Sequence, residues 1–271
     1  MKTLSTKTFG AITKLFQNVS GIKLNESKHA LVAGRLQRMA AEAGESNLEA
    51  YVDKLLRGGA PAQEMTKLID RLTTNETYFF REPQHFNDLA DRLAKVPTGQ
   101  EFLVWSAASS SGEEAYSVAM LMSDVLGLNS QKQPWKIIGT DLSTAMVDSA
   151  RRGLYPMERA RLVPPDYLKK HCLKGQGDQT GQVLISRELR ARVHFEPANL
   201  TQPLPASLPL FDVIFLRNVL IYFENDAKAE IVRRVLGQLK PDGVLYTGHA
   251  ESLSNLGLPV RRVGTAIHGH A

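Results

Sequence analysis

Hydrophobic and polar positions follow two different periods along the chain. In residues 6–72 apolar side chains recur every three or four positions, as in amphipathic helices, and Gly21, Gly44 and the Gly/Pro segment 58–61 interrupt the pattern. In the rest of the chain short apolar runs alternate with helical stretches. The pattern predicts a small all-α N-terminal domain over residues 1–72, followed by an α/β domain.

The second part of the chain alternates strand-like and helix-like segments. Strands are predicted at Phe102–Ser106, Trp135–Thr140, Val193–Glu196, Phe211–Leu216 and Val244–Tyr246. Helices are predicted at Glu114–Leu126, Ser143–Arg152 and Asp226–Leu239. This order is typical of a doubly wound, mostly parallel sheet with helices on both faces, which binds ligands at the carboxyl ends of its strands.

Two stretches depart from this alternation. Residues 155–190 contain a double proline, a glycine-rich turn region and the alternating run 183–185, which predict an inserted small antiparallel β-subdomain with a hairpin. Residues 255–271 are expected to form a terminal hairpin that closes the sheet. The expected division is a helical domain (1–72), a linker that contributes to the active site (73–86), and an α/β domain (87–271) with the insertion at about 155–190.

Composition places the chain among ordinary globular proteins. Of its 271 residues, 43% are hydrophobic and 23% are charged, which argues against a disordered or fibrous chain. No run approaches the ~20 apolar residues of a membrane span, and the N-terminus has no apolar signal segment, so we expect a cytoplasmic protein that does not insert into a membrane. Cys172 is the single cysteine, which excludes an intrachain disulfide and a cysteine-based metal site.

Positive charge is concentrated in the N-terminal quarter. The net charge is +5, and residues 1–72 hold eleven Lys or Arg against seven Asp or Glu. On a helix, Lys28, Arg35 and Arg38 fall within an arc of about 80°, which makes one face partly basic. Such a face suits an acidic protein partner or nucleic acid, or serves solubility alone. The domain lacks a dense basic cluster with interleaved aromatic residues, which counts against nucleic acid.

The loop after the first strand favours a cationic ligand. Residues Ala107–Gly112 are mostly small and allow close approach to the backbone, and Glu113 and Glu114 then begin a helix. Only Gly112 matches a glycine of the dinucleotide fingerprint GxGxxG, and the two carboxylates would repel a pyrophosphate. They suit a methylsulfonium with its ammonium group. The alternative is that both acids serve only the helix dipole.

Polar residues follow the next three strands at the same expected edge of the sheet. Asp141 ends the second strand, where an acid accepts hydrogen bonds from ribose hydroxyls or, alternatively, caps the next helix. Asn199-Leu200 follows the third strand, and Arg217–Phe223 follows the fourth. Each position alone is compatible with ordinary turn chemistry, but together they predict a continuous crevice.

Four segments carry a family resemblance. They are Thr73–Arg81 (TTNETYFFR), Val104–Ser117 (VWSAASSSGEEAYS), Phe211–Phe223 (FDVIFLRNVLIYF) and Leu239–Ser252 (LKPDGVLYTGHAES). In order and interval they resemble the motifs of the CheR methyltransferases, which esterify glutamates of bacterial chemotaxis receptors. The resemblance spans almost the whole chain, with two departures: Ala115 stands where proline is common in the family, and Ala250 where serine is common.

The resemblance implies a Rossmann-like class I methyltransferase sheet that uses S-adenosyl-L-methionine, yields S-adenosyl-L-homocysteine and needs no metal. It implies that the cofactor or reacting centre is contacted by Asn75, Thr77, Arg81, Glu113 or Glu114, Asp141, Asn199, Leu200, Asn218 and Val219. Asp141 would take the ribose, and Leu200 and Val219 would offer backbone or apolar contacts.

A glutamate acceptor is ionised near neutrality, so its methylation requires no general base. We expect Arg81 to position the acceptor carboxylate or a neighbouring backbone oxygen, and the Tyr222 hydroxyl to help fix the methyl donor. For His249 we expect a structural role, and for the terminal residues 268–270 a flexible tail rather than a metal site.

The resemblance also implies a partner, the cytoplasmic domain of methyl-accepting chemotaxis receptors, and recruitment to membrane receptor arrays. Receptor methylation regions are acidic helical bundles, which makes the basic face with Lys28, Arg35 and Arg38 a docking candidate. Some family members bind a receptor's C-terminal tail as an added strand, for which residues 174–187 would provide the edge. No nucleic acid is expected.

Three other functions share parts of this pattern. A nicotinamide dehydrogenase shares the fold class and the ribose acid, but the paired Glu113-Glu114 and the single motif glycine count against it. An RNA methyltransferase would suit the basic N-terminal domain. A non-catalytic cofactor sensor would keep the crevice, but the presence of Arg81 and Tyr222 counts against it.

Overall fold

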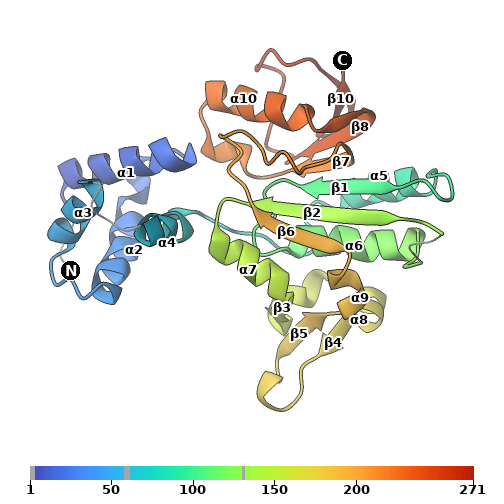
Figure 1. Ribbon diagram of the computed structural model, residues 1–271, viewed down its shortest axis with the longest axis horizontal. Helices are drawn as coiled ribbons and strands as arrows, with labels where there is room; N and C mark the ends of the chain where they lie inside the picture. Colours follow the sequence, from blue (N-terminus) through green and yellow to red (C-terminus); the bar gives the residue numbers. More distant parts are fainter. Residues whose placement is uncertain (1–3, 58–61, 130–131) are drawn as a thin grey trace.

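The N-terminal part of the chain forms a helical domain beside a larger α/β domain. The structure, a computed structural model, describes residues 4–57, 62–129 and 132–271, so the predicted break at 58–61 lies outside the described residues. The α-helices of the helical domain are α1 (Thr6–Ser20), α2 (His29–Glu42), α3 (Leu48–Leu56) and α4 (Ala62–Leu72). Ser5 caps α1 by accepting a hydrogen bond from Thr8 N, and Gly21 ends it with φ +76°. Figure 1 shows these helices gathered in one lobe.

The described part of the α/β domain contains a seven-stranded sheet in the order β6-β2-β1-β7-β8-β10-β9. Its strands are β1 (Phe102–Ser106), β2 (Trp135–Asp141), β6 (Val193–Pro197), β7 (Phe211–Leu216), β8 (Leu239–Thr247), β9 (Val260–Gly264) and β10 (Ile267–His270). Strands β6, β2, β1, β7 and β8 are parallel, and β10 runs antiparallel to both of its neighbours. The prediction of a doubly wound sheet is confirmed.

The chain ends inside this sheet. Ile267 and His268 pair with Tyr246 and Leu245 of β8, and His268 is buried. The expectation of a flexible tail at residues 268–270 is therefore wrong, because these residues complete a strand whose apolar neighbour Ile267 packs into the core.

Helices cover both faces of the sheet (Figure 1). One face, with Val104, Ile137 and Phe215, packs with α5 (Pro83–Leu93), α6 (Glu113–Val125) and α7 (Thr144–Arg152). The opposite face packs against α10 (Asn225–Leu236), and its apolar cluster continues into the helical domain. The alternation of core residues along buried strands thus gives the sheet two separate apolar layers.

The insertion forms a three-stranded antiparallel sheet in the order β3-β5-β4. Its strands are β3 (Leu154–Pro156), β4 (Cys172–Lys174) and β5 (Gln182–Ile185), accompanied by α8 (Pro165–His171) and α9 (Arg187–Arg190). The short 3₁₀ turns among the described residues are η1 (Glu26–Lys28), η2 (Met157–Leu162), η3 (Gly177–Gln179) and η4 (Leu220–Tyr222). The predicted edge at residues 174–187 is corrected: β5 is the central strand and pairs on both sides, so within that range only the end of β4 lies at an edge.

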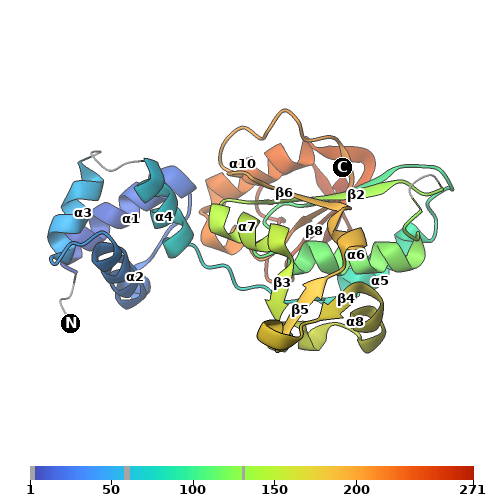
Figure 2. The ribbon, with the colours of Figure 1, turned by 60° about the horizontal axis from the view of Figure 1, so that its bottom comes forward.

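Specific contacts join the helical domain to the α/β domain. Asp70 of α4 lies at the start of α7, where its carboxylate accepts hydrogen bonds from Ser143 Oγ (2.6 Å), Thr144 Oγ1 (3.2 Å) and Ala145 N (3.4 Å). Lys23 N donates to the Tyr222 carbonyl oxygen at 3.1 Å. Figure 2 shows the extended connector that leaves α4 and enters the α/β domain. Among the described residues, no helix is long and apolar enough to cross a bilayer.

Candidate active site

A cleft of about 310 Å³ lies where the carboxyl ends of β1, β2, β6 and β7 face the helical domain. Its walls come from three parts of the chain: the end of α1 with the following loop, the connector 72–81, and the loops that follow the strands. The position agrees with the rule that open α/β sheets bind ligands beyond the carboxyl ends of their strands.

The cleft brings together most of the residues that the sequence nominated. The ones that line it are Asn75, Thr77, Arg81, Glu114, Asp141, Asn199, Leu200, Asn218, Val219 and Tyr222. Glu113 is the exception. Its side chain is fully buried on the other side of the α6 start, where it accepts from Ser111 Oγ at 2.7 Å and lies 3.0 Å from Arg159 Nη1 of the β-subdomain.

Glu114 is therefore the acid that faces the cleft. Its carboxylate accepts a hydrogen bond from Ser106 Oγ at 2.7 Å and lies 3.4 Å from Arg217 Nη1. Burial raises the pKa of Glu114, and Arg217 and Ser106 oppose that shift. A half-satisfied carboxylate at the wall of a cleft is a suitable partner for a cation.

Asp141 lies in the cleft lining and next to the start of α7, but it is not the N-cap of that helix. Its carboxylate lines the cleft and accepts hydrogen bonds from Ser110 N (2.8 Å) and Ser143 N (2.9 Å). The N-cap of α7 is Ser143, so Asp141 shapes the turn before the helix. Burial raises the pKa of Asp141 to about 6, and the nearby Asp70 adds to the shift. Each oxygen retains a lone pair for a hydroxyl donor.

The glycine in the loop after β1 has a packing role. Gly112 has φ +97°, and a Cβ there would lie 2.9 Å from Ala150 Cβ and 3.0 Å from the Tyr155 hydroxyl. Side chains of α7 and the β-subdomain therefore pack against Gly112. The residues of this loop that line the cleft are Ala107, Ala108 and Ser110. The expected close approach of a ligand thus falls on the alanines and Ser110.

Arg81 and Tyr222 lie on the connector side of the cleft. Arg81 donates to the Glu76 carbonyl oxygen at 3.3 Å, and its guanidinium lies 5.3 Å from the Tyr78 ring centroid. Burial raises the pKa of Tyr222, and the charge of Arg81 acts in the opposite direction. Both side chains thus line the same cleft.

Comparisons of the sequence with known proteins identify one family. A profile described as "CheR methyltransferase, SAM binding domain" matches residues 75–266, and "CheR methyltransferase, all-alpha domain" matches residues 7–73. The chain belongs to the CheR methyltransferase family. It is 39% identical to the chemotaxis protein methyltransferase of Escherichia coli (strain K12), with 93% of this chain and 87% of that protein covered. It is 34% identical to chemotaxis protein methyltransferase 2 of Pseudomonas aeruginosa, with 97% and 92% covered.

This CheR chain is therefore an S-adenosylmethionine-dependent methyltransferase with a preceding all-α domain. The cleft fits that cofactor because it offers a half-buried carboxylate, Glu114, for a cationic end and a second carboxylate, Asp141, at the end of β2 for hydroxyl groups.

Two of the asparagines that line the cleft, Asn199 and Asn218, also have structural roles. Asn199 donates from Nδ2 to the Val19 carbonyl oxygen at 2.9 Å and accepts from Thr201, so its amide joins the helical domain to the loop after β6. Asn218 has a left-handed backbone with φ +57°. The backbone is also left-handed at Ser110 in the cleft and at Phe80 and Glu82 next to it, which places sterically costly conformations around the site.

Sequence reasoning missed Glu251, which organises the loop after β7. This buried carboxylate accepts hydrogen bonds from the backbone N–H groups of Asn218, Gly248 and Leu220, each at 2.7 Å, and from Ile221 at 3.3 Å. A Cβ at Gly248 would lie 2.7 Å from Glu251 Oε2. The sequence did offer one signal for Glu251: it is an acidic residue just after strand β8, within the family motif Leu239–Ser252.

A charge network, also missed, lies at the wall of the cleft, which Arg217 and Glu114 both line. Arg217 has a side chain that is 1% exposed, and it lies 3.3 Å from Glu82 Oε2 and 3.4 Å from Glu114 Oε2. Although burial favours the neutral acid, Arg217 and the His249 backbone hold the pKa of Glu82 below its usual range. Residues 135 positions apart in sequence meet here, which no local pattern reveals.

The three residues of the predicted basic face have different surroundings. Arg38 is exposed on α2, and Lys28 is exposed and also borders the cleft. Arg35 is partly buried and donates from Nη1 to the carbonyl oxygens of Leu72 (3.1 Å) and Thr73 (3.0 Å). Arg35 thus fixes the start of the connector, which leaves Lys28 and Arg38 as the more accessible charges.

Proposed function

We propose that this protein transfers the methyl group of S-adenosyl-L-methionine to glutamate side chains of methyl-accepting chemotaxis receptors, forming methyl esters and S-adenosyl-L-homocysteine. The observation that carries the proposal is one cleft in which Glu114 and Asp141 face Arg81 and Tyr222. The chemotaxis methyltransferases that the chain resembles over most of its length support the receptor as substrate.

The cleft has the groups that carboxylate methylation needs. The bound cofactor supplies an electrophilic methyl on a sulfonium. An acceptor glutamate is ionised at neutral pH, so this chain has to align the acceptor oxygen and exclude water rather than remove a proton. Glu114 holds positive charge, and Asp141 accepts hydrogen bonds from hydroxyls. His249 is not part of the cleft lining, in keeping with a structural role.

Arg81 and Tyr222 are the proposed catalytic residues. The Arg81 guanidinium orients the acceptor carboxylate or an adjacent carbonyl oxygen, and the Tyr222 hydroxyl helps to fix the donor. A tight bidentate Arg–carboxylate pair would weaken the nucleophile. Among the described residues the Arg81 guanidinium donates to one backbone carbonyl oxygen, that of Glu76 at 3.3 Å, so further N–H groups remain for a looser contact.

The acceptor helix approaches from the side of the helical domain in this proposal. Lys28 and Arg38 attract an acidic helical bundle, and Lys28 lies at the cleft entrance. A receptor's C-terminal tail would add to the β-subdomain at the edge strand β4, where the Leu173 side chain is 58% exposed. The enzyme acts in the cytoplasm, at receptor arrays.

The test is methyl transfer from radiolabelled S-adenosylmethionine to receptor-containing membranes, with the label checked for release by base. We expect base-labile methyl esters, and a loss of at least tenfold in Arg81→Ala and several-fold in Tyr222→Phe. The matched controls Arg152→Ala and Tyr167→Phe, both outside the cleft lining, should keep wild-type rates. If Arg81→Ala and Tyr222→Phe both stay within twofold of wild type, the assigned roles are wrong.

A further inference from the structure

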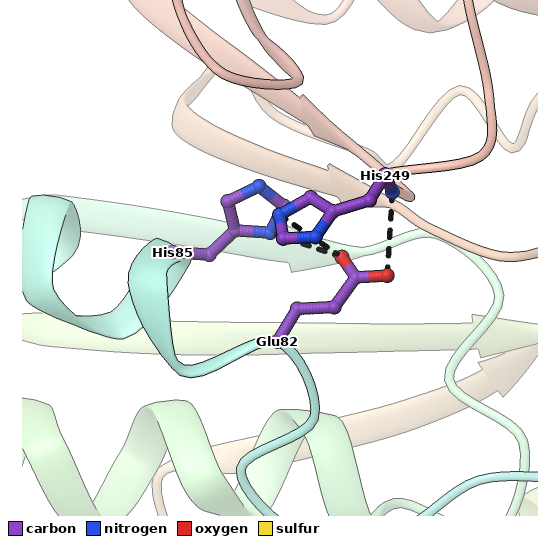
Figure 3. A group of neighbouring side chains, drawn as sticks. All are labelled: Glu82, His85 and His249. Atoms are coloured by element: carbon purple, nitrogen blue, oxygen red, sulfur yellow. Dashed lines mark hydrogen bonds and ion pairs between the residues drawn. The ribbon is translucent and has the colours of Figure 1, made fainter.

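Three potential metal ligands converge behind the wall of the cleft. Glu82 precedes α5, His85 lies in its first turn, and His249 lies in the loop after β8 (Figure 3). None of the three is among the residues that line the cleft. The figure shows both imidazole rings directed toward the carboxylate of Glu82.

The spacing of the ligand atoms is close to that of a tetrahedral site. His85 Nδ1 lies 3.4 Å from Glu82 Oε2, His249 Nε2 lies 4.0 Å from the same oxygen, and all three atoms lie within 4.8 Å of one another. Zn²⁺ bonds of about 2.0–2.2 Å at tetrahedral angles place ligand atoms about 3.3 Å apart. The His85–Glu82 pair already has this spacing, and the partly exposed His249 has to move by only about 1 Å.

Two of these atoms are buried acceptors that face each other. His85 is fully buried, and its Nε2 lies 3.3 Å from the Thr265 carbonyl oxygen. A carbonyl cannot donate, so Nε2 carries the hydrogen and Nδ1 of the neutral ring presents a lone pair. Within the described residues neither Nδ1 nor Glu82 Oε2 has a hydrogen-bond partner. Arg217 Nη2, 3.3 Å from Glu82 Oε2, offsets part of the charge at that oxygen, but the lone pair of His85 Nδ1 still faces it at 3.4 Å. A cation placed between these two atoms would satisfy both.

We propose that Glu82, His85 and His249 form a binding site for one divalent transition-metal ion of the Zn²⁺ type. The ligands are Glu82 Oε2, His85 Nδ1 and His249 Nε2. Two imidazoles and one carboxylate favour zinc, cobalt or nickel over the oxygen-seeking Mg²⁺ and Ca²⁺. The hydrogen bond from His85 to Thr265 is the outer contact that usually orients a metal-bound histidine.

The surrounding charges limit the affinity. Arg217 lies 3.3 Å from Glu82 Oε2 and repels a cation, whereas Glu114, 3.4 Å from Arg217, partly compensates. We therefore expect a dissociation constant for the metal ion on the order of micromolar. The bound ion would cross-link α5 and the loop after β8. Since Glu82 Oε1 also accepts from the Asn218 amide (3.4 Å) and His249 N (3.3 Å), the cross-link would support the wall of the cleft.

The experiment titrates untagged, chelator-treated full-length protein with Zn²⁺ by calorimetry and with Co²⁺ by visible absorption. We expect one ion per chain, tetrahedral cobalt bands and a higher unfolding temperature with Zn²⁺. His249→Ala should weaken binding at least tenfold without impairing folding, because this side chain is 38% exposed. His194→Ala, an exposed histidine of β6, is the matched control and should bind like wild type.

Absence of saturable 1:1 binding in the wild type, or equal binding by wild type and His249→Ala, overturns the site. Glu82→Gln adds a second test that keeps side-chain size and removes the charge. Calorimetry with S-adenosylhomocysteine on the same samples separates the two proposals, since its failure would count against the methyltransferase assignment and leave the metal result standing.

Discussion

The helical domain and the β-subdomain are both attached to the same sheet, but they relate to the cleft in opposite ways. The helical domain supplies cleft residues such as Ser20, Ile22 and Lys28, and its Asp70 binds the start of α7. No described residue of the β-subdomain belongs to the lining. Its polar links to this region do not reach the cleft. Arg159 pairs with Glu113 on the far side of α6, and the Tyr155 hydroxyl donates to the Ser111 carbonyl oxygen at 2.7 Å.

The helical domain thus completes the cleft, whereas the β-subdomain packs beside it. The adjacent acids Glu113 and Glu114 mark the division, because one faces the β-subdomain and the other faces the cleft. Cofactor affinity should therefore respond to changes on the helical-domain side and be insensitive to changes on the other side.

The largest effect is expected at Glu114. Glu114→Gln removes a half-buried charge that faces the ligand, and we expect affinity for S-adenosylhomocysteine to fall about 10- to 100-fold, as for a lost charged hydrogen bond of about 1.5–3 kcal/mol. Glu113→Gln, the matched control, should stay within about twofold. Titration calorimetry measures the affinity of each variant. Equal losses in the two variants would refute the assignment of Glu114, rather than Glu113, to the cleft.

A smaller effect is expected from Asp70→Ala. This change removes the acceptor at the start of α7, next to Asp141, and the loss of a cap costs about 0.5–2 kcal/mol. We expect a lower unfolding temperature and several-fold weaker binding of S-adenosylhomocysteine. Asp70→Asn should rescue part of both losses because it keeps an acceptor oxygen. Asp178→Ala, an exposed acid of the β-subdomain, should change neither quantity.

The raised pKa of Asp141 predicts that cofactor binding depends on pH. Its pKa is raised to about 6, so the hydroxyl-accepting carboxylate is lost below that pH, and affinity should fall from about pH 7 to about pH 5 by no more than tenfold per unit. Asp141→Asn should bind more weakly at neutral pH but show a flatter profile. A wild-type profile that stays level over this range would exclude the role of Asp141.

The raised pKa of Asp141 affects folding stability in the opposite direction from cofactor binding. Because the native pKa lies above the unfolded value of 3.8, the Asp141 contribution is full below about pH 4 and is lost as the pH rises through about 6. Chemical denaturation of Asp141→Asn at neutral pH should therefore show little loss of stability, or a gain.

The smallest effect is expected on the outer surface of the helical domain. Arg38→Glu should raise the KM for receptor a few-fold, most at low ionic strength, because exposed charges act by long-range attraction. Affinity for S-adenosylhomocysteine should not change. Arg161→Glu on the β-subdomain is the control of equal charge change. Methylation rates at several receptor and salt concentrations test this, and equal effects of the two variants would disprove docking at α2.

Much of the fold could be predicted because strands buried on both faces read as apolar runs. Strands β1 and β7 have the predicted bounds, whereas β8 begins five residues earlier than expected, at Leu239, because its polar segment 240–242 masks the strand. In the β-subdomain the alternating run 183–185 predicted most of β5. Its partners β3 and β4 have three residues each, too few for a pattern, so the third strand and the true edge were missed.

Strand position alone predicts the site residues that follow strand ends, whereas Asn75, Thr77 and Arg81 of the connector were predicted from the family motif. Asp141, Asn199 and Asn218 are placed by the parallel sheet itself. The roles of Glu82, Arg217 and Asp70 depend on contacts between distant segments, and the choice between Glu113 and Glu114 depends on helix rotation. Local periodicity does not encode either kind of information.

The left-handed backbone at Ser110 and Asn218 has a practical consequence for directed evolution. Glycine accepts such a conformation without the steric cost of about 1 kcal/mol that other residues incur, so a library sorted for heat resistance alone would tolerate Ser110→Gly and Asn218→Gly. Those clones would keep their fold while losing side chains that surround the reaction space. Selection of improved variants therefore has to score turnover directly, because folding alone does not protect these two positions.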